Sequence, residues 1–557
     1  MSTYVEKTPT GTIYRAAKDY PIPNLDVLSL LFDSAHSYAQ PHTPLHISAA
    51  NPHLALTKSR CRDFTQSTSA ALRKHFNIGA DGPGRDVVSV VSTGHYLLPV
   101  LAYGVIGAGG VFSAACRFQD FSNLSIHSGH YDQSPEDAGW GAGGGRRVVV
   151  MGEGKEWGLW VVGSDGRPES RNLVDEGDRL EWRRITDKKA LEDSLVVLIY
   201  SSGTTGLPKG VKLSHRNLVS QAVTSGDMMK SWIKEKRPDF KYRTIAHLPT
   251  AHIAGIQGYL INPFYIGGTV YWMPKFDFQQ FLDYNAKYRI TFFFTVPPIY
   301  LLIAKSPLAT TQFASLEIAI SGAAPLGKDL QHAASQKLGG PECFIDQTWG
   351  LSETTGSTTI MPLGTHDDTG SVAMLIPNMR ARLVDDHGAD VEPGSAGEVL
   401  VKGPVVCTGY YHNADADKEA FTHDGWFRTG DIAEFRNGMF YVVDRKKELI
   451  KYKGLQVAPA ELEAVLLSHP GILDAAVIGV QTDDGTNEVP RAYVVVGDGG
   501  KTSKEDVMGY VKERVAGYKQ LRGGVFFLDE IPKSPAGKIL RKDLRVLAER
   551  ERRGAKL

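Results

Sequence analysis

The sequence predicts an α/β protein with a large N-terminal domain and a small, mobile C-terminal domain of α+β layers. Apolar runs such as Leu195 to Tyr200 and Ile318 to Ile320 end in loops rich in Gly, Ser or Ala, and helical patterns follow them. This alternation is typical of layered α/β folds. Beyond about residue 440 charged residues become denser. We therefore expect domains at residues 1–443 and 444–557, joined by a hinge near Asp444.

The apolar segment from His95 to Ala115 is long enough to be considered as a membrane span. Pro99 and several glycines interrupt it, and the run from Val87 to Val91 before it has the composition of a buried strand. We therefore expect a buried strand–helix–strand unit here and no membrane span.

Three further segments are assigned by composition and pattern. Asp120 to Gly145 is dominated by Ser, His, Gly and charged residues, which predicts a long surface loop. Ala458 to Glu461 carries the proline that is common at a helix start, and Asp474 to Val480 is predicted to be a strand.

The composition argues against several classes of function. The chain has 557 residues, with 62 Lys and Arg against 62 Asp and Glu, so its net charge gives no support for nucleic-acid binding. Four scattered cysteines without a C-x-x-C pair support neither a disulfide framework nor a zinc ribbon. The N-terminus shows no apolar signal segment, and a reducing intracellular compartment is expected.

The strongest chemical signal is the string YSSGTTGLPKG, which follows an apolar run. Its glycines allow the backbone to approach a polyphosphate closely, its hydroxyls can donate hydrogen bonds or contact Mg²⁺, and its lysine adds positive charge. The spacing is not that of a Walker A loop. It predicts a phosphate-binding loop made by Ser201, Ser202, Gly203, Thr204, Thr205, Gly206 and Lys209.

This string resembles the phosphate-binding loop of the adenylate-forming superfamily, which includes acyl-CoA synthetases, peptide-synthetase adenylation domains and firefly-type luciferases. Further motifs that resemble those of the family follow in order: SGAAPLGK at 321–328, QTWGLSE at 347–353, GWFRTGD at 425–431, DRKKELIKYKGLQVAPAE at 444–461 and SPAGK at 534–538. The hinge string and VPPIYLLIAKSP at 296–307 are most similar to 4-coumarate–CoA ligases.

The resemblance implies an N-terminal AMP-binding (adenylation) domain and a C-terminal AMP-binding-enzyme domain that carries a catalytic lysine. It implies a ligase that uses ATP and Mg²⁺ to join an aromatic or medium-chain carboxylic acid to CoA. The reaction would pass through an acyl-adenylate and release AMP and diphosphate. A stand-alone adenylation enzyme that loads a carrier protein in trans, a luciferase-like oxygenase and a nucleotide-binding pseudoenzyme remain alternatives.

The resemblance also implies roles for individual residues. Lys538 would stabilise charge on the α-phosphate, and the catalytic set would include His252 and Glu353. Mg²⁺ would be held by Thr205 and Glu353. Besides the phosphate-binding loop, the implied ATP- and AMP-binding residues are Ala324, Gln347, Thr348, Trp349, Ser352, Asp431 and Arg445.

The remaining implied residues form the acid and CoA sites. The acid pocket would contain His252, Ala254, Gly258, Gly322 and Gly350. After a rotation of the C-terminal domain about Asp444, the acyl-adenylate and the CoA would be reached by a second set, with Lys447, Lys451 and Gln456 at the acyl-adenylate and Lys453 and Gly454 at the CoA.

Several positions depart from the family pattern. Trp349 stands where the family usually has Tyr, Thr348 where it has Gly and Ser352 where it has Thr, and function is expected to survive these changes. Ala254 and Gly258 stand where coumarate ligases carry bulkier or polar residues, which predicts a wider or less polar acid pocket.

Two features of the sequence concern its address and its partners. The chain ends in Ala555-Lys556-Leu557, a conservative variant of the Ser-Lys-Leu peroxisomal address. A peroxisomal import receptor is therefore an expected partner, and the peroxisome is favoured over the cytoplasm. Few residues follow Lys538, so no downstream carrier domain is expected in cis and free CoA is the favoured acceptor. Residues 116–145 do not resemble the family's usual strand–helix unit, which leaves a variant loop or a faulty gene model open.

Overall fold

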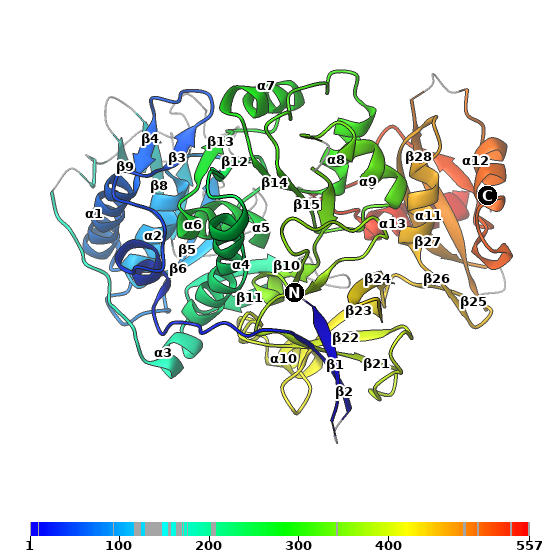
Figure 1. Cartoon of the computed structure of the whole chain (residues 1–557), viewed down its shortest axis with the longest axis horizontal. Coiled ribbons are helices and arrows are strands. Elements are labelled where there is room, and N and C mark those ends of the chain that lie inside the picture. Colours follow the sequence, from blue (N-terminus) through cyan, green and yellow to red (C-terminus); the bar gives the residue numbers. More distant parts are fainter. Residues whose placement is uncertain are drawn as a thin grey trace.

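The computed structural model describes residues 2–8, 11–92, 94–115, 124–128, 147–153, 157–162, 170, 172–174, 177–201, 208–340, 343–482, 486–497, 501–534 and 537–554. Within these ranges the N-terminal three quarters of the chain build several sheets with flanking helices. The C-terminal segment, orange to red in Figure 1, forms a smaller body at one end.

A seven-stranded sheet occupies the end of the molecule opposite the small body (Figure 1). Its central pairs are parallel and an antiparallel strand closes each edge. In spatial order its strands are β11 (Lys209–Leu213), β10 (Val197–Ser201), β6 (Val111–Ala115), β5 (Val87–Ser92), β7 (Leu124–Ser128), β8 (Arg147–Glu153) and β9 (Trp157–Val162).

The expected strand–helix–strand unit is present as β5, α2 (Leu98–Gly107) and β6. Helix α2 is apolar on all sides because α1 (Lys58–Phe76) packs against it. The two helices approach so closely that a Cβ atom on Gly104 would lie 2.5 Å from Cγ2 of Thr68. Among the described residues no helix combines the length and the hydropathy that a membrane crossing requires.

The expectation of a surface loop across Asp120 to Gly145 is wrong for residues 124–128, and the rest of that range lies outside the described residues. Residues 124–128 form β7, whose backbone pairs in parallel with β5 and with β8. The string Leu-Ser-Ile-His-Ser alternates apolar and polar residues, which is the period of a strand. Because the surrounding residues are polar, this short pattern does not stand out in the sequence. In the structure β5 and β8 lie on either side of residues 124–128 and provide the backbone partners that a short strand needs.

Two smaller sheets form the middle of the molecule. One contains β12 (Arg243–Ala246), β13 (Thr269–Trp272), β3 (Pro44–Ser48) and β4 (Ala55–Thr57). The other is a parallel sheet of β14 (Phe292–Thr295), β15 (Ile318–Ser321) and β16 (Ile345–Gln347). The helices of this region are α4 (His215–Lys236), α5 (Ile253–Gly255), a π-helix at Ile256–Ile261, α6 (Asn262–Ile266), α7 (Phe278–Tyr288), α8 (Pro297–Lys305) and α9 (Lys328–Ser335).

An antiparallel sheet joins the two ends of the large body. The N-terminal hairpin pairs with strands that lie more than three hundred residues later in the chain. Tyr14 anchors it, because its buried ring packs 4.7 Å from Phe435 and 5.6 Å from Phe440, measured between ring centroids. The strands are β1 (Thr3–Thr8), β2 (Gly11–Ala16), β21 (Arg380–Val384), β22 (Gly397–Lys402), β23 (Phe427–Arg436) and β24 (Met439–Arg445).

The small body is built on three strands and a hairpin. The predicted helix start and strand are confirmed here as α11 (Pro459–Leu467) and β27 (Ile472–Gln481). The other elements are β28 (Glu488–Val496), β29 (Val525–Phe527), the hairpin β25 (Ile450–Tyr452) and β26 (Leu455–Val457), α12 (Lys504–Lys512) and α13 (Arg541–Gly554). Short elements elsewhere are the π-helix Ser29–Asp33, α3 (Lys188–Asp193), the 3₁₀ helices Ser352–Thr354 and Gly517–Lys519, α10 (Ala414–Ala420), β17 (Gly350–Leu351), β18 (Gly356–Ser357), β19 (Thr359–Ile360) and β20 (Met374–Leu375).

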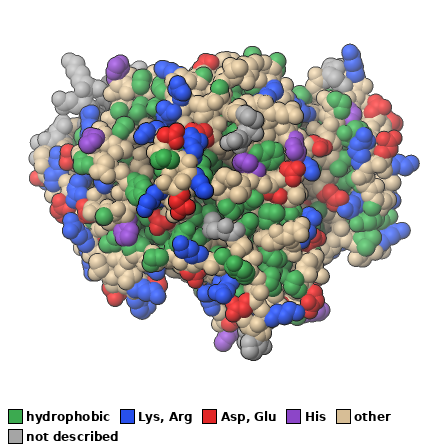
Figure 2. All heavy atoms as spheres, in the orientation of Figure 1, with side chains coloured by type: hydrophobic (Ala, Val, Ile, Leu, Met, Phe, Trp, Pro, Cys, Tyr) green, Lys and Arg blue, Asp and Glu red, His purple; other side chains and the backbone are tan. Residues whose placement is uncertain are grey.

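The small body meets the large one at helices α8 and α9. A Cβ atom on Gly327, which precedes α9, would lie 3.0 Å from Cβ of Ala464 in α11. The ammonium of Lys305 at the end of α8 donates to the carbonyl of Ile472. Figure 2 shows acidic and basic side chains interspersed over one face of the molecule, as the equal numbers of the two kinds suggest.

A buried ion pair fastens α13 to the rest of the small body. Arg541 Nη2 donates to both oxygens of Glu463 in α11, at 2.7 and 2.8 Å, and the same carboxylate accepts the Val477 N–H of β27 at 2.9 Å. Both side chains are largely shielded from solvent. Removal of one partner therefore leaves an uncompensated charge in the interior.

We predict that Arg541→Met lowers the free energy of unfolding of the small body by about 3 kcal/mol, because it leaves the Glu463 carboxylate buried without its counter-ion. Urea unfolding of the full chain measures the effect. Lys542→Met, at an exposed neighbouring position, is the matched control and should change stability little. Equal midpoints for the two variants would contradict the prediction.

Candidate active site

The candidate site lies where parallel strands β15 and β16 end side by side. Gly322 and Ala323 follow β15, and Thr348 and Trp349 follow β16. In a parallel sheet the carboxyl ends of neighbouring strands share one edge, which is the usual place for a ligand. The predicted motifs at 321–328 and 347–353 therefore lie at the same edge of this sheet.

Gln347 fixes the first of these loops. Its Oε1 accepts the backbone N–H of Leu326 at 2.9 Å, which ties the turn containing Ala324 to the end of β16. The hydroxyl of Thr348 donates to the carbonyl of Thr359 at 2.5 Å. Both side chains are buried, so in this structure they shape the edge of the site through backbone contacts.

A cluster predicted for nucleotide binding comes together from three distant segments. The indole Nε1 of Trp349 donates to Oδ2 of Asp431 at 2.8 Å, and Nε of Arg445 lies 3.4 Å from Oδ1 of the same carboxylate. Asp431 is paired with Arg445 across β23 and β24. Burial raises the pKa of Asp431, and the charge of Arg445 and the indole hydrogen bond only partly offset this effect. Each carboxylate oxygen has two lone pairs, so Asp431 keeps acceptor capacity for further hydroxyls.

A second cluster surrounds Tyr410, a residue that the motifs did not identify. The phenol of Tyr410 donates to Oε1 of Glu353 at 3.0 Å, and the Lys209 ammonium lies 5.2 Å from the centre of its ring. The neighbouring Ser352 starts the 3₁₀ helix that carries Glu353. Tyr410 has no distinctive spacing in the sequence, and only the fold brings it to these two residues.

The phosphate-binding loop is described at its two ends. Ser201 and Lys209 are paired across β10 and β11, and the Ser201 hydroxyl donates to the Lys209 carbonyl at 3.5 Å. The other predicted loop residues, Ser202, Gly203, Thr204, Thr205 and Gly206, lie outside the described residues. The predicted address at Ala555-Lys556-Leu557 also lies outside them.

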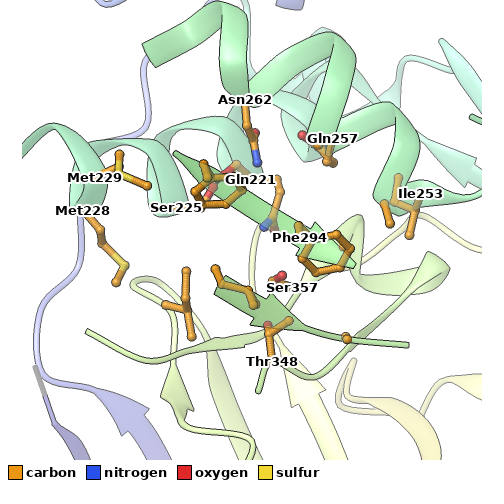
Figure 3. Close-up of a pocket in the computed structure, with 18 of the residues that line it drawn as sticks. Gln221, Ser225, Met228, Met229, Ile253, Gln257, Asn262, Phe294, Thr348 and Ser357 are labelled. Carbon is orange, nitrogen blue, oxygen red and sulfur yellow. Dashed lines mark hydrogen bonds between the residues drawn. The ribbon is translucent and has the colours of Figure 1, made fainter. Parts of the chain in front are cut away.

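All five predicted acid-pocket residues line a single pocket beside the strand edge. These residues are His252, Ala254, Gly258, Gly322 and Gly350, and one face of α4 closes the pocket (Figure 3). Gly350 is required by close approach, because a Cβ atom there would lie 1.9 Å from the Gly356 carbonyl oxygen. At Gly258 a Cβ atom would meet nothing within 4 Å, so the pocket is open at that position, as expected from its sequence. Its lining is mostly apolar, with amide side chains contributed by α4, the π-helix and α6.

His252 is a neutral imidazole in this pocket. Burial, with a smaller contribution from the charge of Lys538, lowers its pKa to about 4. Its Nδ1 accepts the backbone N–H of Ala254 at 3.3 Å, so the ring proton resides on Nε2. His252 can therefore donate a hydrogen bond without carrying charge.

Lys538 reaches the site from the small body. A Cβ atom on the preceding Gly537 would lie 3.3 Å from Pro298 Cγ and from Val296 Cγ2, so this loop packs on the start of α8. The Lys538 charge acts on Asp431 in the nucleotide cluster and on His252 in the acid pocket. Burial and the nearby charge of Arg445 lower the pKa of Lys538 to about 8. The ammonium is thus near enough to both clusters for its charge to act on each of them.

The residues predicted to reach the acyl-adenylate and the CoA lie away from the site in this structure. Lys447, Lys451, Lys453, Gly454 and Gln456 are exposed, and the last four lie on the β25–β26 hairpin at the outer side of the small body (Figure 1). The backbone N–H of Lys451 donates to Glu488 and that of Lys453 to Asn487. Their arrival at the site after a rotation about Asp444 stays a prediction.

Comparison with known proteins agrees with this geometry. Residues 151–411 match the family described as AMP-binding enzyme, and residues 461–538 match the AMP-binding enzyme C-terminal domain. A protein of Emericella nidulans assigned as an acyl-coenzyme A synthetase is 47% identical over 96% of this chain and 97% of its own. The chain belongs to the AMP-binding enzyme family.

Other relatives refine this assignment. The 4-coumarate:CoA ligase 1 of Petunia hybrida is 38% identical over 70% of this chain and 71% of its own. The structure of ATP-bound MatB from Rhodopseudomonas palustris has a TM-score of 0.77 and 26% identity, and covers 94% of this chain and 98% of that one. The predicted α/β class with a large N-terminal and a small C-terminal domain is confirmed. The chain is an ATP-using acyl-CoA ligase that acts through an acyl-adenylate.

We predict that acid-dependent diphosphate release falls with a midpoint near pH 8, far below the ordinary pKa of a lysine. Lys538 carries positive charge only below its pKa, so any step that uses this charge is lost as the pH rises through that value. The kcat/KM for the acid, measured between pH 6 and 9.5, reports the pKa of the free enzyme. A profile that stays flat to pH 9.5 would contradict this midpoint.

Proposed function

We propose that the chain activates an aromatic or medium-chain carboxylic acid with ATP and transfers the acyl group to free CoA. The observation that carries this proposal is that the Lys538 loop packs on the start of α8 and brings its charge close to both His252 and the Asp431–Arg445 cluster. An acid in the pocket and an α-phosphate beside the cluster would meet at this ammonium. The aromatic rings of Tyr242, Phe292 and Phe294 among the lining residues support an acid with an apolar body.

In the first half-reaction a carboxylate oxygen of the acid attacks the α-phosphorus of ATP, and diphosphate leaves. Negative charge grows on the non-bridging α-phosphate oxygens, and the Lys538 ammonium stabilises it. The Nε2–H of His252 orients the carboxylate without adding a charge that would weaken its attack. Asp431 binds the ribose hydroxyls, and the Trp349 indole stacks on the adenine while its N–H holds Asp431 in place.

The residues present fit a bound Mg²⁺ ion. Magnesium is usually held by one or two carboxylates together with phosphate oxygens of the substrate. The buried Glu353 carboxylate, oriented by Tyr410, is such a group, and Thr205 is the second expected ligand. When bound, the ion would neutralise charge on the ATP phosphates.

In the second half-reaction the CoA thiolate attacks the acyl carbonyl carbon, and AMP leaves with the bonding electron pair. The exposed β25–β26 hairpin supports a role for the small domain in this step, since its lysines have no place in the first. We infer that rotation at Asp444 withdraws Lys538 and brings Lys447, Lys451 and Gln456 to the acyl-adenylate. Lys453 and Gly454 would then lie on the path of the CoA thiol.

The direct test is to incubate the protein with ATP, Mg²⁺, CoA and a pool of aromatic and medium-chain acids, and to identify acyl-CoA by mass. An acyl-CoA product of an acid from the pool supports the proposal. Diphosphate release without acyl-CoA would instead indicate a carrier protein as the acceptor.

We predict that Lys538→Ala lowers acid-dependent diphosphate release by about 10²–10³-fold, because one charged donor to the developing negative charge is lost. The same variant should convert supplied acyl-adenylate and CoA to acyl-CoA at close to the wild-type rate. Lys453→Ala is expected to show the opposite pattern, and Lys542→Ala, an exposed control, neither. Equal loss of both half-reactions in Lys538→Ala would contradict the separation of roles.

A further inference from the structure

The acid pocket contains three amide side chains near its middle. Gln221 extends from α4, Gln257 from the π-helix and Asn262 from the start of α6. Figure 3 shows Gln221 between Met228 and Met229 on one side and Ile253 and Phe294 on the other, with Asn262 and Gln257 above it. A Cβ atom on Gly356 would lie 3.7 Å from Cγ of Gln257 and 3.9 Å from Nε2 of Gln221, so both glutamines flank this glycine.

These amides are buried without hydrogen-bond partners. Gln221 is 2% exposed and Gln257 is 4% exposed. Among the described residues, Oε1 of Gln221, Oδ1 of Asn262 and both Oε1 and Nε2 of Gln257 have no partner. An unpaired buried amide is costly, and native proteins rarely keep several in one place without a reason. The pocket thus presents both a donor and acceptors that the fold itself does not use.

Other buried amides in the described part of the chain behave differently. Gln331 also has an unpaired oxygen, but its Nε2 donates to the carbonyls of Ile345 and Asp367. The Nδ2 of Asn285 likewise donates to the Phe281 carbonyl. These side chains brace their own helices and strands. Gln257 contacts no such backbone partner among the described residues and faces the pocket instead.

The pocket offers hydrogen bonds to an uncharged polar group but no counter-ion to a charged one. Its described lining contains no Asp, Glu, Lys or Arg, and His252 is neutral. A second carboxylate or an ammonium on the substrate would therefore be buried without a counter-ion, which is strongly unfavourable. The group that meets the amides must be uncharged. A hydroxyl fits best, because it both donates and accepts a hydrogen bond.

Beyond the amides the pocket becomes apolar and adaptable. Met228 and Met229 lie seven and eight residues after Gln221, about two turns further along the same face of α4. Methionine side chains adjust their shape to the group they contact. This end suits an alkyl or aryl terminus of variable outline.

We infer that the acid activated by this enzyme carries a hydroxyl group between its carboxylate and an apolar end, and that Gln257 and Gln221 recognise that hydroxyl. The inference rests on the proposed function and narrows its substrate class. It differs from the expectation of a merely wider pocket, because the amides select for a polar group and against a plain hydrocarbon chain.

The test compares acids that differ only in a hydroxyl group. The pairs are 4-methoxycinnamic and 3-hydroxy-4-methoxycinnamic acid, and octanoic acid with its 5-, 6- and 7-hydroxy derivatives, so that each hydroxyl lies between the carboxylate and an apolar end. We expect at least one hydroxylated acid to exceed its parent in kcat/KM by about 10²-fold, because the parent leaves the buried amides unpaired. Parents equal or superior to every hydroxylated partner would overturn the inference while leaving the proposed function intact. No diphosphate release with any acid would overturn both.

Substitutions in the pocket test whether the amides cause the preference for hydroxylated acids. Gln257→Leu and Gln221→Leu keep the side-chain volume and should reduce the hydroxyl preference about tenfold or more, chiefly by improving the parent acid relative to the hydroxylated one. Met228→Leu, an apolar change in the same pocket, should leave the ratio between the two acids unaltered. Thermal unfolding should show Gln257→Leu to be at least as stable as the wild type, because the amide contributes no bond to the fold. An unchanged ratio in both glutamine variants would overturn the assignment.

Discussion

The half-buried ammonium of Lys538 is the charge on which the arrangement of the active site depends. A lysine taken out of water needs opposite charges nearby, and Asp431 of β23 and Glu448 beyond the Asp444 junction supply them. Arg445 and Arg541 act in the opposite direction, and together with burial they hold the pKa of Lys538 near 8. The ammonium is therefore retained at neutral pH, close to both Asp431 and the pocket that contains His252.

Several contacts fasten the parts of the small domain to one another. The Asp444 carboxylate accepts the N–H of Arg445 at 2.7 Å and that of Ala460 at 3.0 Å, so it links the end of β24 to the start of α11. Glu463 and Glu448 pair with Arg541 and Arg545 of α13, which fastens the lysine-bearing end of the chain to the segment after the junction. A rotation at Asp444 would thus carry the Lys538 loop and the β25–β26 hairpin together.

The regions of the acid pocket differ in their chemistry. Charge is confined to the mouth, where Lys538 faces a neutral His252. The middle offers uncharged amides and the far end offers thioethers. Under the proposed function, an acid would be selected first by its carboxylate, then by the group it places opposite Gln221 and Gln257, and least by the shape of its terminus.

Local sequence determined much of this protein. Apolar runs gave β10, β15 and the buried β5–α2–β6 unit, because a strand buried on both faces must be apolar throughout. The resemblance of short motifs to those of the adenylate-forming superfamily pointed to Lys538 and to Trp349, Asp431 and Arg445, and the structure brings the last three together. The acid-pocket residues near His252 were found in the same way.

Only the tertiary structure decided the rest. Strand β7 exists because β5 and β8 offer it backbone partners, and Tyr410 joins Glu353 to Lys209 only when segments two hundred residues apart fold together. Gln221 and Gln257 look like ordinary helical residues in the sequence, since nothing local distinguishes an amide that braces a helix from one that faces a cavity. Whether a buried polar atom has a partner depends on what packs against it, and that is fixed by contacts between distant parts of the chain.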